Sequence, residues 1–303
     1  MSRVAAAMGH CAVNYHGLVS RIPEHDGSTE IAEFSQQGGG AAATAVAALA
    51  CLGERTRFIG KVSDDHFGAF LRRGLETLGV DLAHLVVERD RVSPFAYVAV
   101  EKGSGRRRVY WTRGSVTDLR ADEVDLAGAL TGSSVLMLDG TLPMVQLEAA
   151  RTASDRGITV VWDAHMLIDN CEDLLRSTDV LLASERFAME IAPSSALERS
   201  LETLGRMGPS TCIITLGPEG AIGVDRGGVP CRVPALQVDI VDTTAAGHVY
   251  CGAFVYAMMQ GWPLTRSMGF ASTAAGLKCR HLGPRAGMPD LADVLGAMES
   301  LMH

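Results

Sequence analysis

Residues 241–252 read Val-Asp-Thr-Thr-Ala-Ala-Gly-His-Val-Tyr-Cys-Gly, and an apolar, helix-like run continues from them to about Gln260. Small residues in a turn that opens a helix allow several backbone N–H groups to converge at the helix N-terminus, where the helix dipole also favours negative charge. The stretch therefore predicts an anion-binding turn. Taken alone, it is equally compatible with a glycine-containing helix N-cap that binds nothing.

A second glycine-rich stretch favours the anion-binding interpretation. Residues 38–45 read Gly-Gly-Gly-Ala-Ala-Ala-Thr-Ala and also open a helix, and residues 58–68 read Phe-Ile-Gly-Lys-Val-Ser-Asp-Asp-His-Phe-Gly. Two such helix starts, roughly 200 residues apart, suit a cleft that binds a polar substrate beside a polyphosphate. Neither stretch has the spacing of a P-loop or of a strand–GxGxxG–helix fingerprint, so the sequence gives little support to those two sites.

Strand-like and helix-like segments alternate along most of the chain. Short apolar runs are typical of buried strands, and apolar residues at helical spacing are typical of amphipathic helices. The expected strands are 3–9, 57–62, 134–138, 159–163, 180–182 and 212–216, and the expected helices are 42–53, 66–78, 144–154 and 185–191. Such alternation predicts an α/β fold with a mostly parallel sheet that is covered by helices on both faces.

Two stretches interrupt this alternation and read as strand–turn–strand. They are residues 16–36 and 94–113, and the second contains the hairpin-like turn Glu-Lys-Gly-Ser-Gly-Arg at 101–106. We expect a small β-sheet lid, formed by about 12–37 and 93–114 and inserted into a single α/β domain that spans 1–303. The turn at 103–105 has no apolar anchor, which predicts a lid that moves. Exposed edge strands favour a homodimer formed through the lid.

Composition limits the class of partner. The 303 residues carry 27 Lys and Arg against 35 Asp and Glu, a formal charge of −8, which argues against a nucleic-acid-binding protein. The seven cysteines form no CxxC pair and lie mostly in apolar segments, as expected of free thiols in a reducing compartment. No apolar run reaches the roughly 18 residues of a membrane span, and the N-terminus has no secretory pattern. We expect a cytoplasmic protein that binds neither nucleic acid nor membrane.

Further motifs complete a resemblance to a known family. Residues 215–220 (Thr-Leu-Gly-Pro-Glu-Gly) resemble a nucleotide loop TxGxxG, and residues 275–280 (Ala-Gly-Leu-Lys-Cys-Arg) with 283–289 (Gly-Pro-Arg-Ala-Gly-Met-Pro) resemble a C-terminal nucleotide segment. Together with the two glycine-rich stretches, they resemble the ribokinase/PfkB carbohydrate kinases over essentially the whole chain, and most closely the ketohexokinase and sulfofructose-kinase branch. The resemblance implies a three-layer α/β/α sandwich with a β-sheet lid. It also implies phosphorylation of a sugar hydroxyl by ATP with Mg²⁺.

The resemblance implies roles for particular residues. The turn 242–247 would bind the transferring phosphoryl group through backbone N–H groups, with the catalytic positions at Ala245, Ala246, Gly247 and His248. The sugar pocket would be lined by Asn14, Gly39, Gly40 and Ala43, and reached from the lid by Arg108 or its neighbour Arg107. The nucleotide would lie along Ser184, Thr215, Gly217, Gly220, Cys279 and Gly283. Asp242 and Thr244 are expected to hold a monovalent cation such as K⁺.

Some positions depart from the family pattern. His248 stands where the family has an acidic catalytic base, Asn14 stands for an Asp, and Ala43 for a sugar-contacting Asn. An Asn-x-x-Glu pattern that helps to organise the metal reads Ser-Glu-Arg-Phe at 184–187, so Phe187 occupies the acidic position. No arginine equivalent to a sulfonate-binding residue is found in the strand ending at 138–140, which argues against a sulfosugar substrate. The three arginines at 106–108 also suit a solvated hairpin face, and alternation along a strand turns at least one of them away.

His248 leaves three interpretations open. The substitution can inactivate the enzyme, it can be a natural change in a weakly active or non-catalytic relative, or the imidazole can itself accept a hydroxyl proton. A kinase-fold ligand-binding protein without turnover is therefore one alternative. A nucleoside kinase is another, with Tyr110 and Trp111 as candidates for a base slot. Asp163 and His165 follow a strand and could reach the cleft, although a loop histidine is more often structural.

Overall fold

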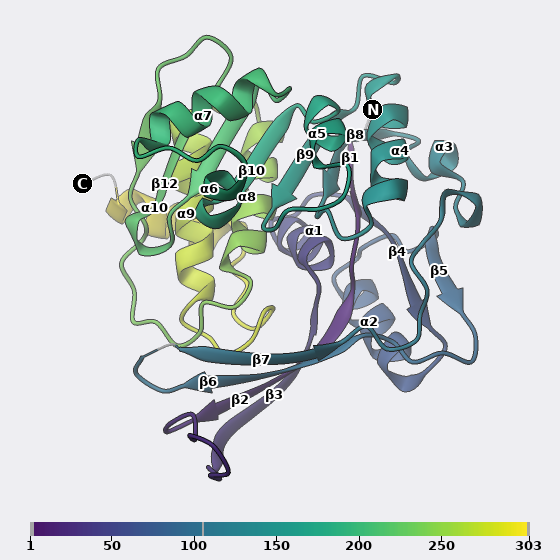
Figure 1. Cartoon of the computed structure of the whole chain (residues 1–303), viewed down its shortest axis with the longest axis vertical. Coiled ribbons are helices and arrows are strands. Elements are labelled where there is room, and N and C mark those ends of the chain that lie inside the picture. Colours follow the sequence, from purple (N-terminus) through teal and green to yellow (C-terminus); the bar gives the residue numbers. More distant parts are fainter. Residues whose placement is uncertain (1–2, 105, 302–303) are drawn as a thin grey trace.

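A large central sheet organises the molecule in the computed structural model, which describes residues 3–104 and 106–301 (Figure 1). Within these residues, nine strands lie in the order β13-β12-β11-β10-β9-β8-β1-β4-β5, and every neighbouring pair is parallel except β11–β12 and β12–β13. The strands are β1 (Val4–Met8), β4 (Thr56–Ser63), β5 (Leu85–Glu88), β8 (Ser133–Leu138), β9 (Thr159–Ala164), β10 (Val180–Ser184), β11 (Thr211–Thr215), β12 (Ala221–Val224) and β13 (Cys231–Val233). The prediction of a mostly parallel α/β sheet is confirmed.

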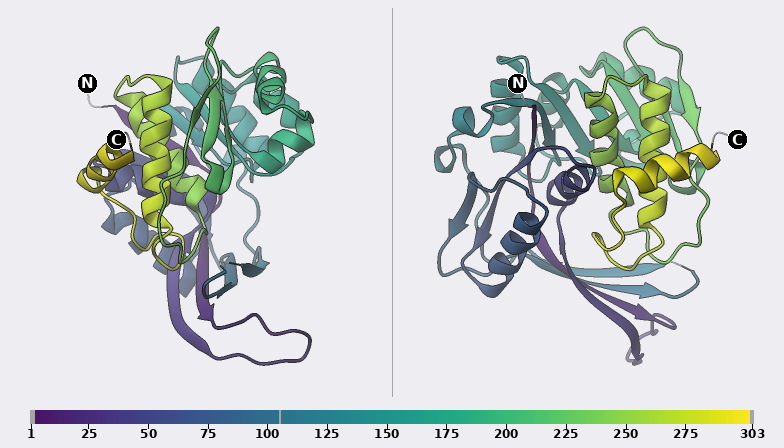
Figure 2. Two further views of the ribbon diagram at one scale, coloured as in Figure 1. Left: turned by 90° about the vertical axis from the view of Figure 1, so that its left-hand side faces the viewer. Right: turned by 180° about the vertical axis from the view of Figure 1, so that it is seen from behind.

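Helices cover both faces of this sheet, as the views in Figure 2 show. One layer contains α1 (Ala41–Cys51), α2 (His66–Thr77), α8 (Ala246–Met259), α9 (Leu264–Lys278) and α10 (Leu291–Leu301), and the other contains α3 (Leu126–Ala129), α4 (Pro143–Ser154), α5 (Cys171–Arg176), α6 (Glu185–Ile191) and α7 (Leu197–Arg206). Alternate residues of β1 face the two layers: Ala5 and Ala7 join one hydrophobic cluster, and Ala6 and Met8 join the other. No helix in the described part of the chain is long and apolar enough to cross a membrane.

A second, four-stranded sheet lies apart from the central one, below it in Figure 1. Its strands β2 (Ala12–Val19), β3 (Ile31–Gly39), β6 (Phe95–Glu101) and β7 (Arg107–Thr112) lie in the order β3-β2-β6-β7. This sheet, called the lid below, is formed by the two stretches that interrupt the helical alternation. Part of the predicted 103–105 turn, Gly105, lies outside the described residues.

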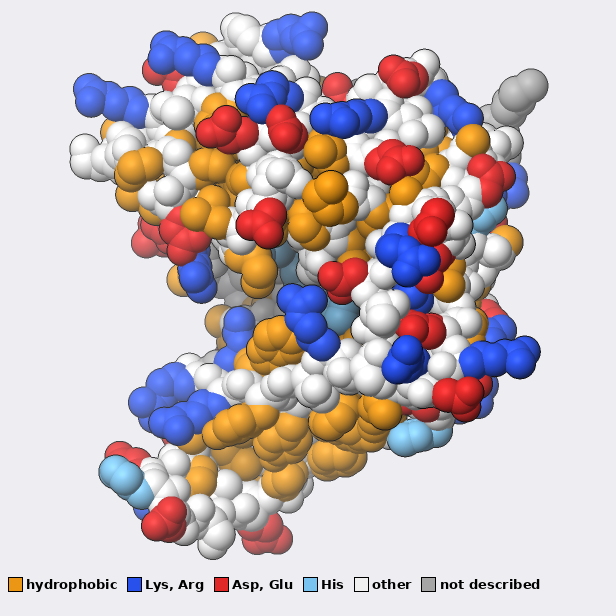
Figure 3. Space-filling model, turned by 45° about the vertical axis from the view of Figure 1, so that its right-hand side comes forward, with side chains coloured by type: hydrophobic (Ala, Val, Ile, Leu, Met, Phe, Trp, Pro, Cys, Tyr) orange, Lys and Arg blue, Asp and Glu red, His pale blue; other side chains and the backbone are white. Residues whose placement is uncertain are grey.

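The lid faces the part of the central sheet where ligands are expected. The strand order reverses at β1, which lies between β4 and β8, and open α/β sheets bind ligands beyond the carboxyl ends of their strands at such a reversal. From Met8, at the end of β1, the chain passes through residues 9–11 directly into β2 of the lid. Figure 3 shows the molecule hollowed between the lid and the central domain, with basic side chains at the rim.

Candidate active site

The turn before α8, residues 242–247, is stabilised by hydrogen bonds to a buried carboxylate. Asp242 is 1% exposed. Its Oδ1 accepts hydrogen bonds from the backbone N and the Oγ1 of Thr244, at 2.8 and 2.7 Å, and its Oδ2 accepts one from the N–H of Gly283 at 2.9 Å. Burial alone would raise the pKa of Asp242, but Lys278 and these hydrogen bonds hold it below its usual range. The turn is therefore fixed around a charged carboxylate.

The residue that caps α8 has an unusual backbone conformation. Ala245 takes a φ of 65°, in the left-handed region that a residue with a Cβ seldom adopts. Such a conformation costs free energy and is kept where the surrounding structure imposes it, often at a functional site. Backbone strain therefore lies at the position where the sequence predicts an anion-binding turn.

A lysine side chain occupies the inner side of the same turn. Lys278, the last residue of α9, is fully buried, and its Nζ donates hydrogen bonds to the carbonyl oxygens of Asp242, at 3.0 Å, and Thr244. Asp242 and Thr244 are the two residues that were expected to hold a monovalent cation. Because their carbonyls already accept from an ammonium group, the residues present do not fit a free ion there.

One cavity, of about 380 Å³, opens on the outer side of the turn. The residues predicted to bind the nucleotide that line it are Thr215, Gly217, Gly220 and Cys279, and Ala246 and Gly247 line it from the turn. Gly220 takes a φ of 90°, and a Cβ there would lie 2.0 Å from the carbonyl oxygen of Val233, so this position requires glycine. The remaining wall is largely apolar and includes Leu236 and Tyr250.

Two of the predicted nucleotide residues do not line this cavity. Ser184 caps α6, where its Oγ accepts from the N–H of Phe187 at 3.2 Å. The N–H of Gly283 instead donates a hydrogen bond to the Asp242 carboxylate. Phe187, which replaces the expected acidic residue, is fully buried and packs edge-on against Trp162 in the core.

A second cavity, of about 740 Å³, lies between the lid and the carboxyl ends of the central strands. It is lined by Asn14 and Gly40, which the resemblance places in the sugar pocket, and by His248, which the resemblance places at the catalytic position. Gly39 does not, but a Cβ there would lie 2.6 Å from the Asn14 amide nitrogen, so the glycine makes room for that side chain. Ala43, in the first turn of α1, is fully buried in the core and does not line the cavity.

Asp139, which the sequence did not single out, joins three segments around this cavity. Its Oδ2 accepts from the backbone N–H groups of His10, at 2.8 Å, and Ala42, at 3.1 Å, and its Oδ1 accepts from Gln146 and Thr141. A carboxylate beside the first turn of α1 is favoured by the helix dipole. Asp139 thereby fixes the ends of β1 and β8 and the start of α1 relative to one another.

His248 belongs to a cluster of three side chains. Its Nδ1 lies 2.8 Å from Oδ2 of Asp163, whose Oδ1 lies 2.8 Å from Nε2 of His165, and the two rings meet edge-on. Burial opposes the charge on Asp163, but the two histidines hold its pKa well below the usual range. Burial likewise lowers the pKa of His165, but Asp163 outweighs it and raises that pKa. One ligand atom from each residue lies within 4.8 Å of the others, so the cluster could also coordinate a metal ion.

The lid contributes Arg107 rather than Arg108. Nη1 of Arg107 donates to Oγ1 of Thr243 in the turn, at 2.7 Å. Val109 and Trp111 share the face of β7 with Arg107, and both line the second cavity. Arg108, the next residue, lies on the opposite face with Tyr110, so the expectation that Arg108 reaches the substrate is corrected by the alternation of the strand.

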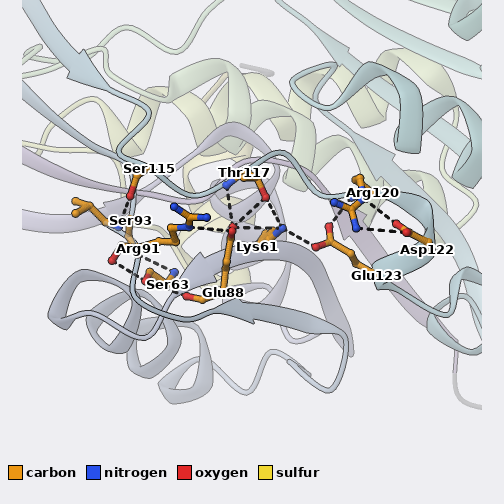
Figure 4. Close-up of polar contacts among 11 residues, drawn as sticks. Lys61, Ser63, Glu88, Arg91, Ser93, Ser115, Thr117, Arg120, Asp122 and Glu123 are labelled. Carbon is orange, nitrogen blue, oxygen red and sulfur yellow. Dashed lines mark hydrogen bonds and ion pairs between the residues drawn. The ribbon is translucent and has the colours of Figure 1, made fainter.

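A buried lysine anchors one wall of the second cavity (Figure 4). Nζ of Lys61 donates to Oγ1 of Thr117, at 2.8 Å, and to Oε1 of Glu123, at 2.7 Å. The N–H of Thr117 donates to Glu88, and the hydrogen bonds from Thr117 and Lys61 lower the pKa of Glu88 to about 2. Residues 116–119, which line the cavity, are thereby fastened to β4 and β5.

Besides Asp139, sequence reasoning missed the cluster around His248 and the contacts of Lys278. Asp163 and His165 were noted only as residues at a strand end, and nothing in the chain indicates that they meet His248. Lys278 lay in a quoted motif without a role, although a lysine among the small and apolar residues 274–279 is an unusual choice for a solvated side chain. This apolar setting of the lysine was the sequence signal that could have identified Lys278 as a buried residue.

The chain matches known proteins over nearly its whole length. A model of the pfkB family of carbohydrate kinases matches residues 3–291. An ATP-dependent ribose-1-phosphate kinase from Halopiger xanaduensis is 29% identical and covers 94% of this chain and 95% of its own. A nucleoside kinase from Methanothermobacter thermautotrophicus is 26% identical, and the match covers 95% of this chain and 93% of that protein. The structure of Arabidopsis thaliana ribokinase complexed with ribose and ATP is 21% identical, with a TM-score of 0.83 over 99% of both chains.

Proposed function

Because the chain belongs to the pfkB family of carbohydrate kinases, we propose that it uses ATP to phosphorylate a hydroxyl of a small sugar or sugar derivative, with His248 accepting the hydroxyl proton. One observation carries the proposal. Ala246 and Gly247 line the first cavity, and His248, the next residue, lines the second. A phosphoryl group held at the turn would therefore face a hydroxyl in the second cavity. The particular branch of the family stays a prediction.

The first cavity suits the nucleotide. Its apolar wall, which includes Leu236 and Cys279, can hold a purine, and the turn at the start of α8 offers backbone N–H groups to the phosphates. ATP enters as substrate with Mg²⁺, which neutralises charge that develops on the phosphates during transfer. The N–H groups of 245–247 would stabilise the charge on the transferring group, the largest contribution expected in this chemistry.

The second cavity suits the sugar that accepts the phosphoryl group, and His248 is placed to accept the proton of the sugar hydroxyl. Because Nδ1 of His248 faces the Asp163 carboxylate at 2.8 Å, it carries the ring hydrogen and leaves Nε2 to accept a proton. The N-terminus of α8 disfavours the imidazolium that forms, but the Asp163 carboxylate stabilises it. Of the three interpretations of His248, the Asp163 contact favours the working base.

A nucleoside kinase is the second candidate, and Trp111 is the observation that favours it. The side chain of Trp111 lines the second cavity from the lid and is 64% exposed, so its ring is available to stack on a base. Tyr110, the other candidate, lies on the outer face of the lid and cannot form the slot.

We also propose a homodimer formed through the lid, in the cytoplasm. The outer face of the lid carries exposed Ile31, Phe34 and Tyr110, and Figure 3 shows hydrophobic side chains gathered along the lid. All seven cysteines are free thiols, as expected in a reducing compartment.

The decisive experiment measures ADP release with a panel of sugars and nucleosides, beside calorimetry of nucleotide binding. We expect turnover with at least one sugar. His248→Ala should lower kcat by about 10²- to 10⁴-fold, the usual contribution of a general base, without changing nucleotide affinity. His84→Gln, in the loop before β5, is the matched control and should behave as the unmodified protein.

Three results would change the assignment. Nucleotide binding without turnover on any acceptor would indicate a ligand-binding protein. Turnover on nucleosides alone would favour the second candidate. A His248→Asp variant about 10²-fold faster than the unmodified protein would show that the histidine impairs the enzyme, because a carboxylate at this helix start accepts the proton with the help of the dipole.

A further inference from the structure

The fully buried ammonium group of Lys278 is hydrogen-bonded to two backbone carbonyl oxygens. Its Nζ donates to the carbonyl oxygens of Asp242 and Thr244, and the Asp242 carboxylate accepts hydrogen bonds from the same turn. Burial lowers the pKa of Lys278, and the Asp242 carboxylate opposes that change. Lysine is almost never fully buried unless it is paired, so the burial of Lys278 indicates a specific role for its ammonium group.

Peptide geometry links these contacts to the phosphate side of the turn. In a trans peptide the C=O and the following N–H point in opposite directions. A cation that draws the carbonyls of Asp242 and Thr244 toward itself therefore aims the N–H groups of Thr243 and Ala245 away from itself. Lys278 lines neither cavity, whereas Thr243 lines the first. The ammonium thus lies behind the turn, and the N–H groups are directed to its other side.

The remaining groups around Asp242 make Lys278 the positive charge of this network. Nε2 of His16 lies 3.8 Å from Oδ2 of Asp242, but burial lowers the pKa of His16 to about 4, so its ring is neutral near pH 7. Arg107 reaches the turn from the lid through the side chain of Thr243 and not through the carbonyls.

We propose that the ammonium group of Lys278 takes the place of a free monovalent cation behind the phosphate-binding turn, so that this site binds nucleotide without potassium. Ammonium and potassium ions are similar in size and both take oxygen ligands. Here the ion is covalently attached to α9 and is present at every salt concentration. Lys278 is thus a positioning residue for the N–H groups of the turn. The proposal rests on the proposed function only in assigning the turn to the phosphates of ATP.

The experiment compares nucleotide affinity by calorimetry in potassium, sodium and tetramethylammonium chloride at equal ionic strength. The unmodified protein should bind a non-hydrolysable ATP analogue with the same Kd in all three salts. Lys278→Ala leaves room for an ion, and its affinity should fall by roughly tenfold or more in sodium or tetramethylammonium and recover in potassium or ammonium chloride.

Two further variants separate positioning from general stability. Lys278→Met fills the space without charge and should bind weakly in every salt. Arg266→Ala removes an exposed positive charge at the opposite end of α9 and should bind normally. A merely structural lysine would lower the melting temperature of both Lys278 variants without making either one respond to potassium, and that result would overturn the proposal.

If both Lys278 variants fail to fold, the salt dependence of nucleotide binding to the unmodified protein still tests the proposal. A Kd that tightens in potassium relative to sodium would show that a free cation is still required, and the proposal would be wrong. Because the readout is nucleotide binding, it does not depend on turnover. If the analogue does not bind at all, the assignment of the turn to ATP fails first, and Lys278 loses its role with it.

Discussion

Both oxygens of one carboxylate, that of Asp163, lie beside imidazole rings of the proposed active site, and one of them is hydrogen-bonded to His248. The side chain is nearly buried, and each oxygen lies 2.8 Å from a ring nitrogen, one of His248 and one of His165. A ring held at one nitrogen keeps a single orientation and tautomer, which is what a proton acceptor needs. Asp163 and His248 are 85 positions apart, so their contact depends on the packing of α8 beside β9 and not on local sequence.

Replacing Asp163 by Asn should lower kcat by about 10²- to 10⁴-fold with little change in nucleotide affinity, because the amide keeps the shape but supplies no charge for the imidazolium. Steady-state kinetics and calorimetry measure the two effects. An NMR titration should also show that the pKa of His165, which this carboxylate raises, falls in the variant. A fall in that pKa with an unchanged kcat would contradict the role of Asp163 in the reaction.

His16 predicts a loss of stability in acid. Its ring is fully buried and its pKa is about 4, below the ordinary 6.5. Between these values the unfolded chain binds a proton that the folded protein does not, so the free energy of unfolding falls as the pH falls from 6.5 to 4, by at most about 1.4 kcal/mol per pH unit from this residue. His16→Leu should flatten that dependence in urea titrations. An unchanged slope would show that His16 is not the responsible group.

The fate of single residues shows what the sequence could predict. Position within a motif grouped Thr215, Gly217 and Cys279, and the structure brings them to the lining of one cavity, where Thr215 and Gly217 lie at the end of β11 and Cys279 follows α9. Their role in binding a nucleotide stays a prediction. Position within a motif could not decide which of Arg107 and Arg108 faces the cavities. A strand turns the two side chains to opposite faces, and the register of the strand is set by partners far along the chain.

At the scale of elements, the sequence indicated several of the helices and most of the parallel strands but missed the amphipathic helix α7 and several short strands. The helix over 185–191 has the bounds that the sequence indicated, and the predicted helix 42–53 ends two residues early because Gly53 adopts a φ of 95°. Strands β5, β12 and β13 have three or four residues, too few to show an alternating pattern. Helix α9 mixes Gly, Ser and Thr with apolar residues all round, so it lacks the apolar stripe by which a surface helix is recognised.

The lid should close over bound substrates. Strands β2 and β3 are tied to the segments around the turn by His16, which lies 3.8 Å from Asp242, and by the hydrogen bonds of Gln37 to residues 282–286. Strand β7 reaches the turn through the exposed hydrogen bond between Arg107 and Thr243, which can break and re-form. We expect amide hydrogen exchange in β6 and β7 to slow when a sugar and an ATP analogue are both bound, because closure excludes water from the phosphoryl group. Arg107→Gln should weaken this protection. Exchange that is unaffected by both ligands together would contradict closure.

At the scale of the whole molecule, the two faces of the lid differ. Strand register places Phe34, Tyr97 and Tyr110 on the face turned away from the cavities, where Phe34 is 57% exposed and stacks on Tyr15. We expect a dimer in light scattering after size-exclusion chromatography. Phe34→Glu should shift it toward monomer, because a charge would be buried in an apolar contact. A monomeric unmodified protein at the same concentrations would contradict the lid-mediated dimer, and Val229→Glu, an exposed apolar position far from the lid, should leave the assembly unchanged.

The short joints between the two sheets have a mechanical consequence. Residues 9–11 alone join β1 to β2, and Gly40 alone separates β3 from α1, while Ala12 pairs with Gly39 beside them. We expect the closing lid to pivot near these joints, so that displacement grows with distance from them. Asn14, close to the joints, would then move little, whereas Arg107, at the far end of β7, would move most. The acceptor side of the site would thus be largely in place before closure, and closure would complete the phosphate side.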